Sequence, residues 1–339
     1  MSALGRHLLS IDDLGRSGIE GLLEIAASFA EVVTRDIPKV PALKGRMVAT
    51  LFAESSTRTR SSFETAAKRL SADVLSLTTV ASSMAKGESV KDTVRTLRAI
   101  GADALVVRHP AEGVPVQVAR WTEASVVNAG DGCHEHPTQA LLDCFTLQRH
   151  FGGGAGGGGG QGFLEGARVA IVGDILHSRV ARSCTKAFVS LGARVTLAGP
   201  KTLLPTFAGE WPAELSCELE PVLYETDVLY LLRMQRERGA GVFVPSEREF
   251  AHLYGIDERR LGMLAGKAVI MHPGPVNRGV EMTSAVADSD RSLALDQVHN
   301  GVAVRMAVLY LLVAGGGAVG KEADGGPAIG APGFPGADR

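Results

Sequence analysis

The sequence predicts an α/β protein with two doubly wound parallel-sheet domains and an active site in the cleft between them. Short apolar runs rich in β-branched residues alternate with helical patterns along most of the 339 residues. The runs are apolar almost without interruption, which is typical of strands buried on both faces of a parallel sheet. The alternation stops at a glycine-rich stretch and then restarts, which indicates two α/β units. The chain is also too long for one ordinary core.

In the first half, each predicted strand precedes a predicted helix. The strands are expected at 47–52, 73–80, 104–110 and 125–132, and the helices from 61 and at 89–101, 114–122 and 136–151. In the second half the pattern is repeated. Strands are expected there at 167–175, 193–200, 227–233 and 268–275, and helices at 178–192 and 292–314. The last helix is predicted to be amphipathic.

These elements divide the chain into six predicted parts. They are a first domain (1–135), a connecting helix (136–151), a glycine-rich loop (152–162), a second domain (163–290), a C-terminal helix that packs back on the first domain (291–314) and a disordered tail (315–339). The loop is expected to be irregular because a glycine run loses too much backbone entropy in a helix or strand. The tail is rich in Gly, Ala and Pro, a composition that does not build a core.

Composition and charge exclude several classes of protein. The formal net charge of −2 gives no global field for nucleic acid or a membrane surface, so an anion site must be a local cluster. We expect no secretory leader, and no segment has the about 20 consecutive apolar residues that a membrane-spanning helix needs. Both features favour a cytoplasmic location. The cysteines show no close pairing and are predicted to be free thiols in a reducing compartment: Cys133, Cys144, Cys184 and Cys217.

Polar residues follow the predicted strands, and ligands of parallel α/β sheets bind at the carboxyl ends of strands. After the first strand, Ser56, Thr57, Arg58 and Thr59 open a helix. Hydroxyl groups, a guanidinium fork and the free N–H groups of a helix N-terminus together suit a phosphate dianion. The alternative is an exposed capping box with solvated arginines. The segment lacks the spacing of the nucleotide-binding loop, so ATP is not indicated.

A second polar segment combines His136 with Gln139 at the start of the connecting helix. Both are neutral donors on one helical face, and a helix N-terminus lowers the pKa of a histidine, so they suit a carbonyl oxygen. The alternative is a histidine that only caps the helix. Cys133, His134 and His136 are too close together for a usual zinc site, so neither a metal nor a cofactor is predicted.

The second half offers cations for a different anion. Arg233 and Gln235 alternate at a strand end and Arg179 lies near a helix start, a set that suits a dicarboxylate. The alternative is a solvated charged face. Lys86 lies on a polar loop from which it could reach an anion, and the alternative for it is a solvated lysine.

Taken together, the motifs closely resemble those of the aspartate carbamoyltransferases, within the aspartate/ornithine carbamoyltransferase superfamily. The resemblance extends from about residue 7 to 314 and rests on STRTR (56–60), KGES (86–89), RHP (108–110), HPTQ (136–139), GDILHSRVARS (173–183), LLRMQRER (231–238) and HPGPVNRGVE (272–281). Ornithine-specific members typically carry a cysteine where Pro273 stands. The resemblance implies transfer of the carbamoyl group of carbamoyl phosphate to the amine of L-aspartate. The products are N-carbamoyl-L-aspartate and phosphate, in pyrimidine biosynthesis and without a cofactor.

The resemblance also implies roles for single residues. The implied carbamoyl-phosphate ligands are Ser56, Thr57, Arg58, Thr59, Ser82, Lys86, Arg108, His136 and Gln139. The implied aspartate ligands are Lys86, Arg179, Arg233, Gln235, Pro273 and Gly274, and the implied domain-closing pair is Glu54 and Arg238. Within these sets, the implied catalytic residues are Arg58, Thr59, Lys86, Arg108 and His136. Many family members have leucine at the position of Gly274, which leaves the local loop shape open.

Ser82 and Lys86 match a loop that enters a neighbouring subunit's site, which implies a homotrimer with shared sites. Three other interpretations remain at this point. One is a carbamoyltransferase for another amino acid, and one is a catalytically silent assembly subunit. A third is a dinucleotide-binding dehydrogenase, prompted by VAIVGDI, although the G-x-G-x-x-G turn is absent there. The sequence does not decide whether trimers assemble further with dihydroorotase or regulatory chains, or whether effectors act on them.

Overall fold

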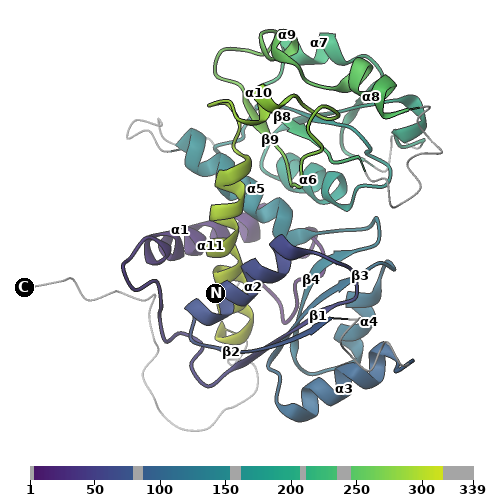
Figure 1. The fold of residues 1–339 in the computed structure, drawn as a ribbon. Helices are drawn as coiled ribbons and strands as arrows, with labels where there is room; N and C mark the ends of the chain where they lie inside the picture. Colours follow the sequence, from purple (N-terminus) through teal and green to yellow (C-terminus); the bar gives the residue numbers. More distant parts are fainter. Residues whose placement is uncertain (1–3, 79–86, 153–161, 207–210, 235–245, 316–339) are drawn as a thin grey trace, which may run out of the picture.

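The computed structural model of the chain describes residues 4–78, 87–152, 162–206, 211–234 and 246–315. Two parallel sheets lie in separate lobes, one above the other in Figure 1, and each is flanked by helices. The predicted α/β class with two parallel sheets is confirmed. The glycine-rich loop and the C-terminal tail lie outside the described residues, except for Gly152, Gly162 and Gly315.

The first sheet has the strand order β2-β1-β3-β4, with all neighbouring strands parallel. Its strands are β1 (Met47–Phe52), β2 (Asp73–Thr78), β3 (Ala104–His109) and β4 (Ser125–Asp131). Its helices are α1 (Gly15–Val33), α2 (Thr57–Arg69), α3 (Val90–Ile100) and α4 (Val114–Trp121). All four strands are at the predicted places. Helix α2 begins at Thr57, four residues before the predicted start, because the extended backbone of Ser56 already serves as its N-cap.

Helix α1 has no counterpart among the sequence-based predictions. Three glycines in its first seven residues weaken the intrinsic helix preference of this segment. Its face with Ile19, Leu22 and Leu23 is fully buried, and the helix packs against the last helix of the chain. Tertiary packing therefore forms a helix that local propensity does not indicate.

Alternate residues of β1 face two different helical layers. Val48 and Phe52 belong to a core shared with α2, whereas Ala49 and Leu51 belong to a core shared with α3 and α4. Successive side chains of a strand point to opposite faces, so a strand covered on both sides is apolar throughout. This arrangement explains the uninterrupted apolar runs in the sequence.

The second sheet has the order β7-β6-β5-β8-β9 and is also parallel throughout. Its strands are β5 (Arg168–Val172), β6 (Arg194–Ala198), β7 (Glu214–Ser216), β8 (Val228–Leu231) and β9 (Val269–Met271). Its helices are α6 (Arg179–Ser190), α7 (Leu219–Tyr224), α8 (Glu247–Tyr254), α9 (Glu258–Leu261) and α10 (Ser284–Ala287), with a 3-10 turn η3 (Lys201–Leu203). The sequence analysis did not predict β7, α7, α8, α9 or α10, which have three to eight residues and too few periods to stand out.

Two long helices, α5 (Pro137–Gly152) and α11 (Ala294–Val313), connect the lobes. Figure 1 shows α11 running from the lobe of the second sheet across α5 to the lobe of the first. It packs against α1, α2 and α5, and it also contacts β9. Every residue from 303 to 309 is buried, so the helix is enclosed on all sides there. The prediction of an amphipathic helix was wrong, because no face of this part is left for water.

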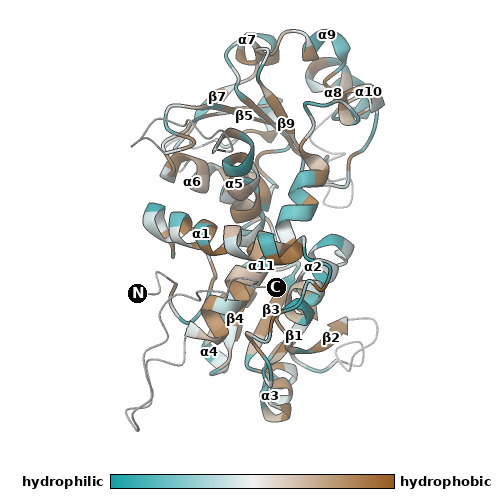
Figure 2. Ribbon diagram, turned by 90° about the vertical axis from the view of Figure 1, so that its left-hand side faces the viewer, coloured by the Kyte–Doolittle hydropathy of each residue, from teal (hydrophilic) through white to brown (hydrophobic). Residues whose placement is uncertain are grey.

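Figure 2 shows the apolar colouring of α11 where it passes between the neighbouring helices. Among the described helices, none combines the length and the apolar character needed to cross a bilayer. All four cysteines are free, as predicted.

The packing of α5 between the lobes should be sensitive to the shortening of its buried side chains. Phe145 of α5 is 1% exposed. We expect Phe145→Ala to lower the free energy of unfolding by about 3–5 kcal/mol, because it removes buried apolar surface and leaves a cavity. Denaturant unfolding followed by circular dichroism measures the change.

Ile37→Ala serves as the control, since Ile37 is 77% exposed. Its effect is expected to stay within about 0.5 kcal/mol. Equal effects of the two substitutions would contradict the assignment of α5 to the core.

Candidate active site

Each sheet has one point where its strand order reverses. In the first sheet this switch point lies between β1 and β3, and in the second it lies between β5 and β8. Ligands of open parallel sheets bind at such points, beyond the carboxyl ends of the strands. Arg108 lies near the carboxyl end of β3, and the segments that follow β1, β5 and β8 carry Arg58, Arg179 and Arg233. The topology therefore brings the predicted site residues to the carboxyl ends of both switch-point strands.

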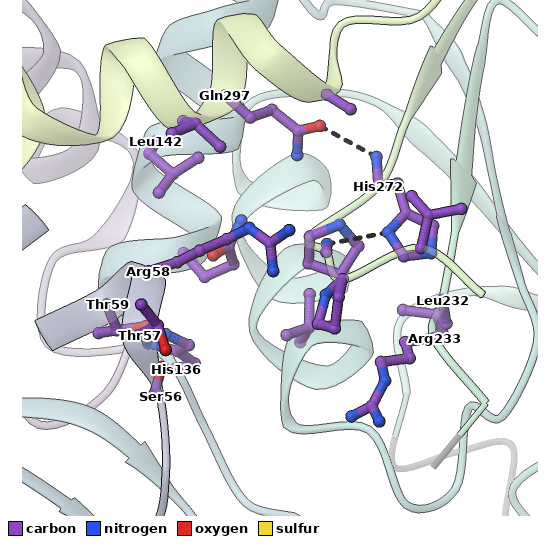
Figure 3. Close-up of a pocket in the computed structure, with 18 of the residues that line it drawn as sticks. Ser56, Thr57, Arg58, Thr59, His136, Leu142, Leu232, Arg233, His272 and Gln297 are labelled. Carbon is purple, nitrogen blue, oxygen red and sulfur yellow. Dashed lines mark hydrogen bonds between the residues drawn. The ribbon is translucent and has the colours of Figure 1, made fainter. Parts of the chain in front are cut away.

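A cleft of about 1160 Å³ lies between these strand ends and is lined from both lobes (Figure 3). Most of the predicted site residues line it: Glu54, Ser56, Thr57, Arg58, Thr59, Arg108, His136, Gln139, Arg179, Arg233, Pro273 and Gly274. Four other predicted residues lie outside the described residues: Ser82, Lys86, Gln235 and Arg238.

The N-terminus of α2 forms one wall of the cleft. The backbone of Ser56 is extended and its side chain makes no capping hydrogen bond, so the capping-box alternative does not describe this helix start. The first N–H groups of a helix have no partner within the helix. Those of α2 therefore combine with the Ser56, Thr57 and Thr59 side chains that line the cleft to form an electropositive wall of donors.

Arg58 extends from this wall toward the loop on the opposite lobe (Figure 3). A β-carbon added at Gly274 would lie 2.9 Å from Cζ of Arg58. The backbone of Gly274 also has a positive φ of 67°, which side chains other than glycine rarely adopt. Glycine at this position therefore allows the loop backbone to approach the guanidinium group directly.

Glu54 joins the two lobes through arginines. Its Oε2 accepts a 2.7 Å hydrogen bond from Nη2 of Arg179, and its Oε1 lies 3.5 Å from Nη2 of Arg108. Arg179 is only 3% exposed, so it is not part of a solvated charged face. Arg108 also donates from Nη1 to the carbonyl oxygen of Ala129 at 3.0 Å. A single carboxylate thus holds one cation from each lobe at the cleft.

His136 precedes α5 and is 3% exposed. Its Nε2 lies 3.5 Å from Oγ1 of Thr59, and its backbone N–H donates to Oγ of Ser183 at 2.9 Å. Burial, then the charges of Arg108 and Arg305, lower the pKa of the imidazole well below its ordinary value. The sequence analysis predicted this direction from the helix N-terminus, whereas the structure attributes it to desolvation and two cations. The neutral ring can donate one hydrogen bond to a ligand.

His134 does not join His136 in a metal site. Its Nδ1 lies 3.2 Å from Oδ2 of Asp131, in a separate pair. In the parts of the chain that the structure describes, no group of three or more His, Cys, Asp or Glu side chains is arranged to hold a metal ion.

Sequence reasoning missed several lining residues: Ser62, Leu142, His272, Gln297 and Arg305. Arg305 is buried in α11, and its Nη1 donates to Oγ of Ser62 at 2.9 Å. Burial lowers the pKa of this guanidinium to about 10. The signal that could have identified it is a single charge within the apolar run VAVRMAVLYLLVA.

His272 and Gln297 shape the loop opposite Arg58. The backbone N–H of His272 donates to Oε1 of Gln297 at 2.9 Å, and Nδ1 of His272 accepts from the N–H of Gly274 at 2.8 Å. Figure 3 shows both bonds as dashed lines. Burial, with Arg58 and Arg233 nearby, lowers the pKa of His272 to about 3. The side chain is therefore a neutral structural group rather than an acid.

The lowered pKa of His136 leads to a test in solution. A depressed pKa means that the ring stays neutral as the pH falls from 8 to about 6, whereas an ordinary histidine would begin to gain a proton there. NMR of histidine-labelled protein should show no titration of the His136 ring over this range. The signal is assigned by its loss in His136→Asn. An inflection between these pH values would contradict the neutral state.

Comparison with known proteins identifies both halves. Residues 6–149 match the model of the aspartate/ornithine carbamoyltransferase carbamoyl-phosphate-binding domain. Residues 165–312 match the model of the aspartate/ornithine-binding domain of the same family. The aspartate carbamoyltransferase catalytic subunit of a Nocardioides species is 56% identical over 312 residues, 91% of this chain and 95% of that protein. The one from Acidothermus cellulolyticus is 54% identical over 311 residues, 92% of this chain and 93% of that protein.

Solved structures agree in fold. Aspartate transcarbamoylase from Trypanosoma cruzi, in complex with carbamoyl phosphate and aspartate, superposes with a TM-score of 0.80 at 30% identity, covering 92% of this chain and 98% of that one. The catalytic subunit of the M. jannaschii enzyme superposes with a TM-score of 0.77 at 34% identity, covering 93% of this chain and 100% of that one. These matches exclude the dinucleotide-binding dehydrogenase. With both switch points facing one arginine-lined cleft, the chain belongs to the aspartate/ornithine carbamoyltransferase family.

Proposed function

We propose that the chain is an aspartate carbamoyltransferase. It transfers the carbamoyl group of carbamoyl phosphate to the amine of L-aspartate and releases N-carbamoyl-L-aspartate and phosphate. The observation that carries the proposal is one cleft that is lined by the N-terminus of α2 and Arg58 from one lobe and by Arg179 and Arg233 from the other. Two anionic substrates need two cationic walls, and the names of the relatives support this pair of substrates.

The phosphate of carbamoyl phosphate binds at the start of α2. The free N–H groups, the hydroxyl groups of Ser56, Thr57 and Thr59, and the guanidinium of Arg58 surround one space at the cleft wall. Each hydrogen bond to a charged group contributes roughly 1.5–3 kcal/mol, so three or four of them hold a dianion. The proposed Lys86 and Ser82 add to this side from a neighbouring subunit.

The carbonyl oxygen of carbamoyl phosphate lies near His136, Arg108 and Thr59. The neutral imidazole of His136 donates a hydrogen bond, and Arg108 supplies positive charge to the oxygen as the amine attacks. Gln139 holds the carbamoyl NH₂. The chemistry needs no protein nucleophile, because the leaving phosphate can accept the proton of the attacking amine.

The acceptor binds on the wall of the second lobe. Arg179 and Arg233, with the proposed Gln235 and the backbone at Pro273 and Gly274, suit two carboxylates. Ornithine would need an acidic partner for its side-chain ammonium group. The acidic side chains among the described lining residues are Glu54 and Asp288, and both pair with arginines. This pairing favours aspartate over ornithine.

Catalysis then depends mainly on positioning. Holding two reactants in the attacking geometry can contribute about 7–11 kcal/mol to the barrier reduction. The Glu54–Arg179 pair already connects the lobes, and the proposed Arg238 joins it as the domains close and exclude water. A silent assembly subunit would not be expected to keep these groups in one cleft.

In this proposal, residues 1–135 are the carbamoyl-phosphate-binding domain and residues 163–290 the aspartate-binding domain. Residues 136–151 form the connecting helix, and the helix at 291–314 packs back on the first domain. The enzyme is a homotrimer with shared sites, acts in the cytoplasm and provides the carbamoyl-aspartate of pyrimidine biosynthesis. The four free thiols support a reducing compartment. Assembly with dihydroorotase or regulatory chains would build on this trimer.

The proposal predicts that Arg58→Ala keeps the fold and loses turnover. We expect kcat/KM to fall at least about a hundredfold, or about 2.7 kcal/mol, since a charge-assisted contact to the leaving phosphate is removed. The measurement is formation of carbamoyl aspartate from carbamoyl phosphate and L-aspartate. Arg60→Ala is the matched control, because Arg60 lies on the same helix and pairs with Glu64 at 3.7 Å. Full turnover by Arg58→Ala would refute the phosphate assignment.

Shared sites predict complementation between inactive subunits. Arg58→Ala and Lys86→Ala each abolish turnover alone. After dissociation and mixing in equal amounts, random trimers restore about one intact site in four, because each site takes Arg58 from one subunit and Lys86 from its neighbour. Activity should therefore recover to about a quarter of the wild-type value. No recovery, with subunit exchange verified by mass spectrometry, would rule out sharing.

A further inference from the structure

Asp143 is a buried carboxylate that none of the roles assigned above uses. It lies on α5, one helical turn after Gln139, and its side chain is 0% exposed. A charge so far from water must be hydrogen-bonded to remain ionised. Four side chains from four different elements donate to it.

The two oxygens of Asp143 have different partners. Oδ1 accepts from Nε2 of Gln139 at 3.0 Å and from Nε2 of Gln297 at 2.7 Å. Oδ2 accepts from the hydroxyl group of Tyr230 at 2.7 Å and from Sγ of Cys184 at 3.3 Å. One oxygen therefore serves two glutamines, and the other serves two groups of the second lobe.

A carboxylate only accepts hydrogen bonds, so each glutamine must turn its NH₂ group toward Asp143. This orientation directs the two amide oxygens elsewhere. Oε1 of Gln297 accepts from the backbone N–H of His272, at the base of the loop that faces Arg58. Gln139 lines the cleft, and with its nitrogen bound to Asp143 its oxygen is the atom left to accept from a ligand NH₂.

Burial raises the pKa of Asp143 to about 6, and the four donors act in the opposite direction. Four donors at 2.7 to 3.3 Å suit the ionised carboxylate, whose two oxygens only accept hydrogen bonds.

We propose that Asp143 is a positioning residue that sets the amide orientation of both Gln139 and Gln297. Through Gln139 it presents an acceptor to the carbamoyl NH₂, and through Gln297 it fixes the 272–275 loop on the opposite wall. One carboxylate thereby aligns both walls of the cleft. This inference rests on the proposed function, because the carbamoyl NH₂ is the ligand group that Gln139 would bind.

The test measures kcat and both KM values of the full-length enzyme with carbamoyl phosphate and L-aspartate. In Asp143→Ala the glutamine amides lose their shared acceptor. We expect KM for carbamoyl phosphate to rise roughly tenfold, the change that one such hydrogen bond supports. The expected change in kcat is smaller, because the contact exists before and during the reaction.

Asp143→Asn should restore the orientation. Its Oδ1 can accept from both glutamines, and its NH₂ can donate to the oxygen of Tyr230. We expect KM for carbamoyl phosphate within about twofold of the wild-type value. If Asp143→Asn were as impaired as Asp143→Ala, the negative charge rather than amide orientation would matter, and the proposal would fail.

Tyr230→Phe is the control for a purely structural role. It removes a donor from the other oxygen of the same carboxylate and should lower the melting temperature without changing KM for carbamoyl phosphate. A rise in KM equal to that of Asp143→Ala would show that loss of packing alone explains the effect. If Asp143→Ala does not fold, Asp143→Leu in the Tyr230→Phe background replaces it, with Tyr230→Phe alone as its reference.

The proposed function and this inference can fail separately. A wild-type enzyme that forms no carbamoyl aspartate overturns both. An active wild type with an unchanged KM for carbamoyl phosphate in Asp143→Ala overturns only the positioning role.

Discussion

The active cleft depends on the packing of α5 and α11 between the two lobes. A parallel sheet can present its ligand-binding edge only at the carboxyl ends of its strands, and this chain contains two such sheets. Their switch points form one site only if the edges face each other. The buried helices α5 and α11 are packed together, and each also contacts elements of both lobes. Burial of almost every residue in the middle of α11 holds this arrangement in place.

The cleft concentrates positive charge in a chain that is nearly neutral overall. Six arginines are among its described lining residues: Arg58, Arg108, Arg179, Arg233, Arg278 and Arg305. Their mutual repulsion is partly offset by Glu54, which pairs with one arginine of each lobe. Two anionic substrates would supply the remaining negative charge. The same field explains why His136 and His272 are neutral, since burial and nearby guanidinium groups both oppose protonation.

The arginines attract anionic ligands, whereas neutral polar groups determine how a bound ligand is oriented. The imidazole of His136 and the amide of Gln139 can each donate or accept only at defined atoms, so their orientation determines what they recognise. Asp143 accepts from the amides of Gln139 and Gln297, and in the proposal above it sets the orientation of both. The buried polar network is also fully connected from α5 to the 272–275 loop, which favours a single arrangement of the two walls.

The sequence alone determined much of the sheet architecture and many of the residues that line the cleft. Continuous apolar runs predicted every strand of both sheets except the three-residue β7. Polar segments at strand ends predicted Arg58, His136 and Arg179, and the family resemblance added Arg108 and Gly274; all five line the cleft. These features are local, because the residue patterns that indicate a buried strand or a helix start span only a few consecutive residues. The tertiary structure alone decided the enclosure of α11, the glycine-weakened helix α1, the causes of the His136 pKa and the convergence of Arg305, Asp143 and Gln297 on the site. Each of these depends on contacts between residues far apart in the chain, and such contacts have no period or spacing in the sequence.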